Sequence, residues 1–366
     1  MKFIILQQDL IPTLQAVARS TGVRSQLPVL GNILLQTSAG KLKLSSTNLE
    51  IGVVKFINAE ILEEGEVTVP AKTFVEVIAN LSGEKLVISA STDQIEISTP
   101  TFSSKLNGIS ASEFPSIPLL GKEAVVIEPE ILIKALPEII FAAAMDDGRP
   151  TLTGILTEIK DKKLQLVATD GYRLAHKIVP IAETATFKAL IPKRTFEEIV
   201  RLISEEEVDS IKISVSEDNN QMIFAFGNTQ VSSRLIEGQF PAWEKIIPEK
   251  TISRVILDRG DFLKAVKLAA VFSRNEANIV KLNCLEGKIV LSSEAKELGS
   301  QEKQVETEKE GEDISIAFNT KFLIDAFSNL NTKQVLMEFS GTLSATLIKP
   351  IGEEGLQYIV MPVNLS

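Results

Sequence analysis

Cysteine and histidine are almost absent from this 366-residue sequence: each occurs once, as Cys284 and His176. One cysteine cannot form an intrachain disulfide or a thiolate zinc cluster, and one histidine cannot build a multi-histidine metal site. A serine or cysteine nucleophile would depend on His176 alone, and its apolar neighbours indicate a strand position and a structural role. The sequence therefore favours a reducing compartment and predicts no metal, no cofactor and no nucleophilic catalysis.

Long hydrophobic runs are missing as well. The apolar run at the N-terminus ends at Gln7, too early for a signal peptide, and no stretch has the length of a membrane span. The net charge of -10 argues against a protein that neutralises phosphates over its whole surface. We expect a cytoplasmic protein without a membrane partner, in which any basic surface is local.

A repeat of long period organises the chain. KLKLSSTNL begins at Lys41, KLQLVATDG at Lys163 and KIVLSSEAK at Lys288, so the opening lysines are 122 and 125 residues apart. A second set of matching segments follows: VPAKTF ends at Phe74, IPKRTF at Phe196 and AFNTKF at Phe322. The spacing predicts three domains of ordinary size, with the boundaries 1–120, 121–249 and 250–366.

Each repeat has the same internal order. Apolar periodicity predicts an early helix over residues 8–21, 129–144 and 258–273, and alternating residues then predict strands. A second helix follows each of the later matching segments, and further strands close the unit. The fold class is therefore α+β, with helices packed on antiparallel sheets in each domain.

Some predicted helices carry basic residues opposite their apolar stripe. Lys264 and Lys267 lie on the polar side of the helix at 258–273, and Arg194 and Arg201 lie on that of the helix after Ile191. Solvated helix faces are the ordinary explanation of such a pattern. Its recurrence in an acidic protein makes a purely solvated face a weaker explanation.

Three segments carry a resemblance to a known family. VATDGYRLA (167–175), LPVLGNILL (27–35) and YIVMPVNL (358–365), within a threefold repeat, resemble the bacterial DNA sliding clamp, the beta subunit of DNA polymerase III. The resemblance covers the whole chain. It implies three clamp domains, a homodimeric ring around double-stranded DNA, and a non-catalytic processivity factor.

The resemblance also implies residues for DNA contact. Arg24 matches a basic residue that contacts DNA in the family, and Arg149 lies near the matching loop of the second domain. With the four basic helix residues, the predicted DNA-binding set is Arg24, Arg149, Arg194, Arg201, Lys264 and Lys267. A clamp must slide, so its DNA contacts are expected to be weak and non-specific.

A pocket for short, partly hydrophobic peptides is the second implied feature. Its expected partners are the catalytic subunit of DNA polymerase III, the clamp loader and other proteins with a clamp-binding motif. The matching residues are Leu152, Thr169, Gly171, Tyr172, Arg173, Leu174, Pro241, Ile246, Ile359, Met361, Pro362 and Val363. Aliphatic and methionine side chains suit an adaptable groove that serves many partners.

The resemblance implies a dimer interface between the first and third domains. The matching residues are Lys72, Ser104, Leu106, Val271 and Phe272, with Phe272 as the expected aromatic anchor. Ser104 stands where the family often has phenylalanine.

Two other functions are compatible with parts of the sequence. One is an enzyme that binds a divalent ion through Asp146, Asp147 and Asp170, although no glycine-rich phosphate loop or dinucleotide fingerprint accompanies them. The other is a repeat scaffold that binds protein partners but never encircles DNA.

Overall fold

The computed structural model describes residues 1–22, 27–38, 40–121, 123–146, 148–216, 220–273, 278–296 and 299–364. The chain folds into two compact units. The first consists of Met1–Pro129 and Glu197–Leu235, and the second of Glu130–Phe196 and Ile236–Ser366.

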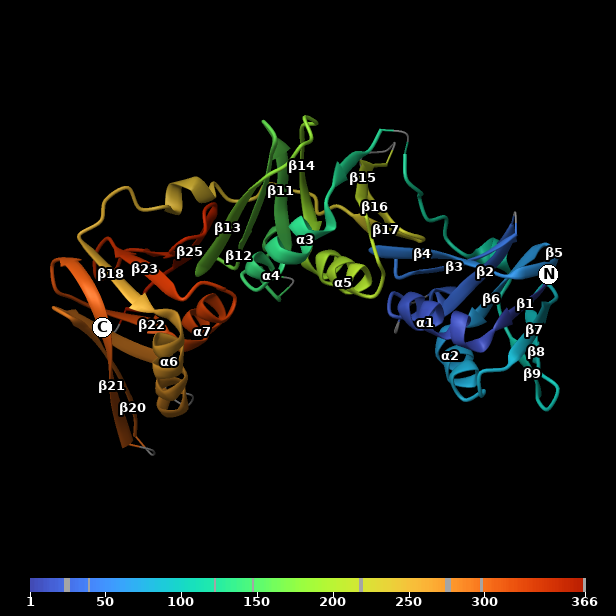
Figure 1. Cartoon of the computed structure of the whole chain (residues 1–366), viewed down its shortest axis with the longest axis horizontal. Coiled ribbons are helices and arrows are strands. Elements are labelled where there is room, and N and C mark those ends of the chain that lie inside the picture. The colour runs from blue at the N-terminus through green and yellow to red at the C-terminus, as the bar shows by residue number, and fades with distance from the viewer. Residues whose placement is uncertain are drawn as a thin grey trace. The chain divides into compact units, whose positions relative to one another are not determined.

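In the described residues, the first unit contains two antiparallel sheets and the helices α1 (Gln7–Ala18) and α2 (Ala71–Ala79). The smaller sheet has, in spatial order, β5 (Glu60–Glu63), β1 (Lys2–Leu6), β7 (Lys85–Ala90), β8 (Gln94–Ser98) and β9 (Ser103–Asn107). The larger has β10 (Val125–Ile127), β15 (Ile211–Val215), β16 (Gln221–Phe226), β17 (Thr229–Arg234), β4 (Ile51–Asn58), β3 (Lys41–Thr47), β2 (Asn32–Ser38) and β6 (Gly65–Pro70). α1 packs against α2 and against β3 and β4 (Figure 1).

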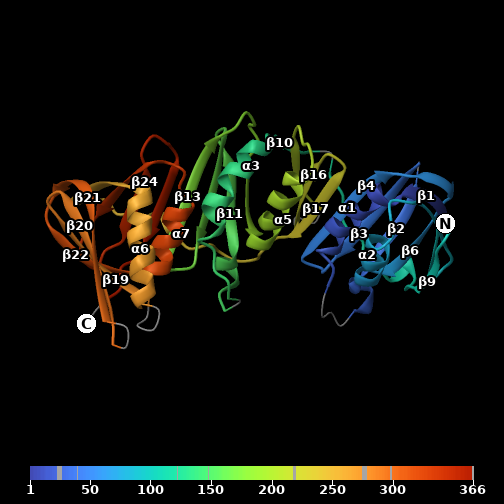
Figure 2. The same ribbon diagram turned by 60° about the horizontal axis from the view of Figure 1, so that its bottom comes forward.

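The second unit is built on one long antiparallel sheet in the described residues. Its strands are, in spatial order, β14 (Phe187–Pro192), β11 (Gly154–Lys160), β12 (Lys163–Thr169), β13 (Arg173–Pro180), β25 (Leu356–Val360), β24 (Thr346–Pro350), β23 (Gln334–Phe339), β18 (Ser253–Asp258), β21 (Gly299–Gly311), β20 (Lys288–Ala295), β19 (Ile279–Leu285) and β22 (Ile314–Asn319). Its helices include α6 (Arg259–Ser273) and α7 (Thr320–Ser328), which lie side by side in both views (Figures 1 and 2).

The sequence repeat is visible in how the strands are buried. β3 and β12 each begin at the opening lysine of their repeat and share one residue-by-residue pattern of exposure. The strands that follow, β4 and β13, also share one pattern, as do β6 and β14. The predicted α+β repeat is confirmed, because corresponding residues meet corresponding environments.

One predicted helix is interrupted. The helix expected over residues 129–144 is α3 (Pro129–Ala135) followed by α4 (Pro137–Ile140), and turns continue the chain. Pro137 has no amide hydrogen and cannot continue the helical hydrogen-bond ladder, so the helix restarts there. The second helix of this repeat, α5 (Lys193–Ser204), is continuous as predicted.

Two strand pairings join predicted domains that follow one another in the chain. β4 pairs with β17 inside the first unit, and we call this pairing the first junction. β13 pairs with β25 inside the second unit, and we call it the second junction. The sheets run continuously across the predicted boundaries at residues 120 and 249, and these boundaries stay a prediction.

Candidate functional site

The segment TDGYR forms a tight turn between β12 and β13. Oδ1 of Asp170 accepts hydrogen bonds from the backbone amides of Tyr172 and Arg173, at 2.9 and 3.0 Å. Gly171 has a φ of +91°, and a Cβ atom there would lie 2.7 Å from Nη1 of Arg149. The Asp170 side chain thus holds the following two residues in place, and the positive φ favours glycine at position 171.

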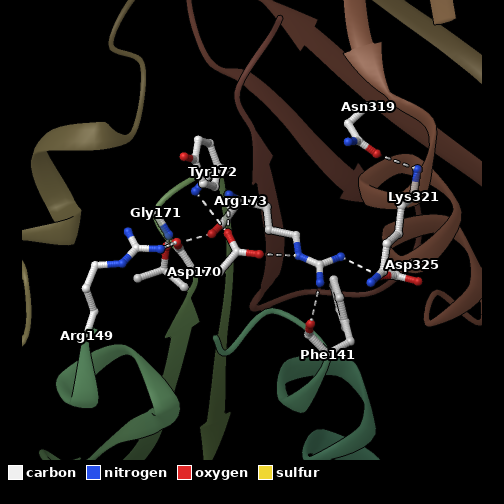
Figure 3. A network of polar contacts seen from close by, with 10 residues as sticks. Phe141, Arg149, Asp170, Gly171, Tyr172, Arg173, Asn319, Lys321 and Asp325 are labelled. Atoms are coloured by element: carbon white, nitrogen blue, oxygen red, sulfur yellow. Dashed lines mark hydrogen bonds and ion pairs between the residues drawn. The ribbon is translucent and has the colours of Figure 1, made fainter. Parts of the chain in front are cut away.

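Arg173 lies at the centre of a polar network (Figure 3). Its Nε donates to Oδ2 of Asp170 at 3.0 Å, Nη1 to Oδ2 of Asp325 at 2.5 Å, and Nη2 to the carbonyl of Phe141 at 2.8 Å. The guanidinium also lies 4.9 Å from the ring centre of Phe322 and 5.3 Å from that of Phe141. Although charged, Arg173 is only 8% exposed. Its fork ties the turn to α7 and to the residue after α4.

Tyr172 points outward beside this network. The residue is 59% exposed, and its ring stacks on Phe322 with 6.2 Å between ring centres and 19° between ring planes. The C-terminal tail runs past it, because the amide of Met361 donates to the carbonyl of Tyr172 at 2.9 Å. The amide of Val363 then donates to the carbonyl of Ala317 at 2.8 Å. Turn, helix and tail thus meet at one place.

An apolar cluster lies next to the turn, under the second junction. Its buried members are Leu156, Val167, Leu174, Leu190, Trp243, Ala345, Leu347 and Ile359, and Met361 packs against them while partly exposed. An open groove of about 870 Å³ borders the cluster and is lined by residues that include Ile246, Ser344, Ala345 and Met361. The lining of the groove is mixed: apolar side chains such as Ile246, Ile247 and Met361 lie beside the charged residues Glu244, Lys245, Glu249 and Lys250.

All twelve expected pocket residues belong to the second unit, and the structure shows which of them are accessible. Those buried in it are Leu152, Thr169, Arg173, Leu174 and Ile359, and those exposed or half-buried are Gly171, Tyr172, Pro241, Ile246, Met361, Pro362 and Val363. The second set is therefore accessible from solvent, and the first set is not.

Phe322 contributes to this region but was not predicted from the sequence to do so. Phe322 was aligned with Phe74 and Phe196, which are both buried. In the structure the fourth residue of α7, Leu323, takes the core position, and Phe322 is turned to the site. Phe322 is the third residue of α7, whereas Phe74 is the fourth residue of α2. The orientation of Phe322 therefore depends on the residue at which the helix begins.

A second ionic cluster lies further along β13. Nζ of Lys177 pairs with Oε2 of Glu138 at 3.0 Å and with Oε1 of Glu353. Nδ2 of Asn331 donates to the other Glu138 oxygen at 3.4 Å. Burial raises the pKa of the Glu138 carboxyl above 4.5, and Lys177 acts against this shift. One ammonium thus serves two carboxylates, so the cluster carries excess negative charge.

His176 is buried on β13, as predicted, and its ring lies 4.4 Å from that of Trp243. Burial lowers the pKa of His176 to about 4, so the ring is neutral near pH 7. Burial likewise raises the pKa of the Cys284 thiol to about 12. Among the described residues, no group of three or more His, Cys, Asp and Glu side chains could hold a metal ion.

The predicted DNA-binding residues differ in what they contact. Arg194 and Lys267 are exposed on α5 and α6. Arg201 pairs with Glu198 at 3.1 Å, and Lys264 pairs with Asp261 at 3.4 Å. Both cations are exposed, although Glu198 is itself buried and also accepts from Nε of Arg19 at 3.0 Å.

Two DNA candidates stand apart from the helix faces. Nη2 of Arg149 donates to the carbonyl of Asp170 at 2.8 Å, so this arginine braces the turn between β12 and β13 (Figure 3). Arg24 lies outside the described residues.

The predicted dimer residues lie on surfaces of both units. Ser104 and Leu106 are half-buried on β9, an edge strand of the smaller sheet, and Lys72 is exposed on α2. Val271 is 48% exposed on α6, where Phe272 follows it half-buried. An edge strand with free backbone groups is a ready template for pairing with another chain.

No helix in the described part of the chain is both long and apolar enough to cross a membrane. Repeated α+β domains joined through their sheets, with a groove and a stacked aromatic pair at one junction, define a class of multidomain proteins rather than a particular chemistry.

Comparison with known families assigns the fold. Models for the N-terminal, central and C-terminal domains of the DNA polymerase III beta subunit match residues 1–118, 126–242 and 244–364. The chain therefore belongs to the DNA polymerase III beta subunit family, the beta sliding clamps. The resemblance noted in the sequence is confirmed, as is the fold of three clamp domains.

Individual relatives agree over their full length. The chain is 30% identical to the beta sliding clamp of Synechococcus elongatus and 27% identical to that of Staphylococcus aureus, covering 100% of this chain in both and 100% and 99% of the relatives. The solved beta subunit of Thermotoga maritima superposes with a TM-score of 0.92 at 26% identity, with full coverage of both chains. A Pseudomonas aeruginosa sliding clamp, solved bound to griselimycin, gives 0.93 at 27%, also with full coverage.

As a member of this family the chain is a non-catalytic subunit that serves DNA replication. The alternative of a carboxylate enzyme is set aside on this finding. Asp147 lies outside the described residues. Asp170 uses its carboxylate to hold the turn and Arg173, and Oδ1 of Asp146 accepts from the amide of Gly148 at 3.1 Å.

Proposed function

We propose that two copies of this chain close into a ring around double-stranded DNA and tether DNA-processing proteins through the groove beside Tyr172 and Met361. The partners are the catalytic subunit of DNA polymerase III, the clamp loader and other proteins with a clamp-binding motif. The protein acts in the cytoplasm, where replication takes place. The observation that carries the peptide site is the meeting of the turn, α7 and the tail over an apolar cluster.

The charge distribution supports topological rather than tight binding of DNA. The chain carries a net charge of -10, while Arg194, Lys264 and Lys267 are accessible on helices. Weak contacts from a few cations let a ring slide, and the acidic remainder repels stray DNA.

The peptide site is tested by fluorescence anisotropy with a labelled pentapeptide, Gln-Leu-Ser-Leu-Phe. We expect saturable binding with a Kd of about 1 μM, as for a small interface. Binding should be lost when residues 361–366 are deleted and weakened in Tyr172→Ala. Glu50→Ala is the matched control, because Glu50 takes the place of Tyr172 in the corresponding turn of the first repeat. A wild type that does not bind the peptide contradicts the proposed site.

The ring is tested separately. The protein should sediment near twice its chain mass of 40.0 kDa, and Phe272→Ala should shift it toward monomer. After loading, it should stay on closed circular DNA and leave once the circle is cut. A stable wild-type monomer at micromolar concentration contradicts the ring, and a scaffold that binds only proteins is never retained on the circle.

A further inference from the structure

Arg173 belongs to the expected peptide pocket, yet its side chain faces away from solvent. All three nitrogens of its guanidinium donate, to acceptors on the turn, on α7 and after α4. A planar fork matches such a set of acceptors only in one orientation. Arg173 therefore has little surface left for a partner and instead fixes the segments that surround it.

The neighbouring aromatic pair depends on this arrangement. The backbone of Tyr172 is held on one side by Asp170 and on the other by the amide of Met361. Its ring lies on Phe322, and Phe322 also meets the guanidinium of Arg173. Phe322 and Asp325 belong to α7, whereas Tyr172 and Arg173 belong to the turn. The ion pair thus keeps two separate chain segments in the register that stacking requires.

We propose that Arg173 is a positioning residue: through Asp170 and Asp325 it holds Tyr172 and Phe322 as a flat aromatic wall of the partner pocket, and it makes no contact with the peptide itself. The inference rests on the proposed peptide site. A binding site loses affinity when the residues that support it become loose, even though every contact residue is still present.

Two substitutions separate positioning from direct contact. Arg173→Lys keeps the positive charge but replaces the planar guanidinium, which donates here through all three nitrogens, with an ammonium that donates from one nitrogen. Asp325→Asn keeps the shape of the α7 partner, removes its charge, and is the milder change because Asp325 is partly exposed. Each should weaken binding of the labelled pentapeptide about tenfold, within the range known for coupling through such networks. The double variant should bind no more weakly than the weaker single variant, because both break one link.

The control is Arg254→Lys. Arg254 lies in the same unit and pairs with Glu338 at 3.0 Å, but it is exposed and distant in sequence from the turn. Its affinity for the pentapeptide should equal that of the wild type. A loss shared by this variant would show a general effect of arginine removal and would overturn the proposal.

A spectroscopic readout reports the wall directly. The sequence has two tyrosines, Tyr172 and Tyr358, so protein labelled with 3-fluorotyrosine gives two ¹⁹F resonances, which Tyr172→Phe assigns. In Arg173→Lys and in Asp325→Asn, the Tyr172 resonance should move and sharpen as the ring leaves Phe322.

The outcomes separate the two proposals. Weaker binding together with a moved Tyr172 resonance supports the positioning role. Unchanged affinity, or weaker binding with the resonance in place, overturns it. A wild type that fails to bind the pentapeptide overturns the proposed peptide site instead, whatever the resonance shows.

Discussion

The first and second junctions share one backbone plan but are filled differently. In both turns an Asx side chain, Asn48 or Asp170, accepts from two backbone amides. The strand that follows carries Gly52 in the first junction, where the second has Leu174. A Cβ atom on Gly52 would lie 2.9 Å from Cγ2 of Ile117, so the first junction is closed by its own chain.

The strands that receive β4 and β13 extend this contrast. Gly52 faces Ser232 of β17, whereas Leu174 faces Ile359 of β25. The first junction therefore packs small residues against a loop from its own repeat. The second packs aliphatic residues and leaves a groove beside them. A repeat can thus keep its backbone plan at both junctions while the two are filled differently.

Replacing the buried lysine of each junction should give the largest effect. Lys55 and Lys177 are the fifth residues of β4 and β13 and are both buried. Lys177→Met leaves two carboxylates without a cation, and we expect a loss of about 3–5 kcal/mol in unfolding free energy. Lys55→Met should cost less, because only Glu206 is left and Thr229 still donates to it at 2.8 Å.

Urea unfolding of both lysine variants measures this difference. Equal losses of unfolding free energy would show that the second carboxylate beside Lys177 has no effect on stability. The predicted difference between the two junctions would then be wrong.

Filling the closed junction should have the next largest effect. In Gly52→Ala the added Cβ would lie 2.6 Å from Oγ of Ser232 as well as against Ile117, and overpacking of this kind costs about 1–3 kcal/mol. Gly31→Ala is the control, because its Cβ would meet nothing closer than 3.9 Å. Thermal melts of the two variants decide: a Gly52→Ala protein as stable as the control would mean that Ile117 moves aside freely.

The histidine of the second junction should make stability depend on pH. The counterpart of His176 in the first junction is Val54. Because burial lowers the folded pKa of His176 from 6.5 to about 4, the unfolded chain binds the extra proton first on acidification. Stability should fall by about 1.5 kcal/mol between pH 6.5 and about pH 5.

Unfolding of wild type and His176→Val across this range tests the assignment. We expect the variant to be less stable than the wild type at every pH, because Gln357 loses its hydrogen bond to His176. Its slope should nevertheless be flatter, since the sequence has no other histidine. Parallel slopes would place the titration elsewhere.

Part of this fold could be predicted from the sequence alone. The repeat predicted the strands that begin at Lys41, Lys163 and Lys288, because alternation and spacing are local properties of the chain. The break at Pro137 was missed, although the signal was present in the residue itself.

The Arg173 network could not be derived in this way. Its partner Asp325 is 152 positions away in the chain, and no local pattern pairs them. The orientation of the Phe322 side chain depends on the start of α7, which is shifted by one residue relative to the matching helix of the first repeat. The family resemblance supplied the expected pocket residues, but only the fold separates those that are accessible from those that are buried.

The smallest expected effect comes from the acid beside Lys177. Glu138→Gln removes one of two carboxylates that share a single ammonium, and the new amide can still accept from Asn331. Because burial raises the folded pKa of Glu138 above 4.5, its ionised form is disfavoured in the folded chain. Removing that charge should change stability by less than about 1 kcal/mol near pH 7, far less than Lys177→Met.

The sign of the pH dependence distinguishes this explanation from a simple lost ion pair. A raised carboxyl pKa means that the folded chain binds a proton before the unfolded chain does, so the wild type gains stability from this group as pH falls toward 4.5. Glu138→Gln lacks this gain, so its unfolding free energy should drop below that of the wild type as the pH is lowered. If Glu138 served mainly as the partner of Lys177, the variant would be weakest near pH 7 and would approach the wild type in acid; urea titrations at both ends of the range separate the two.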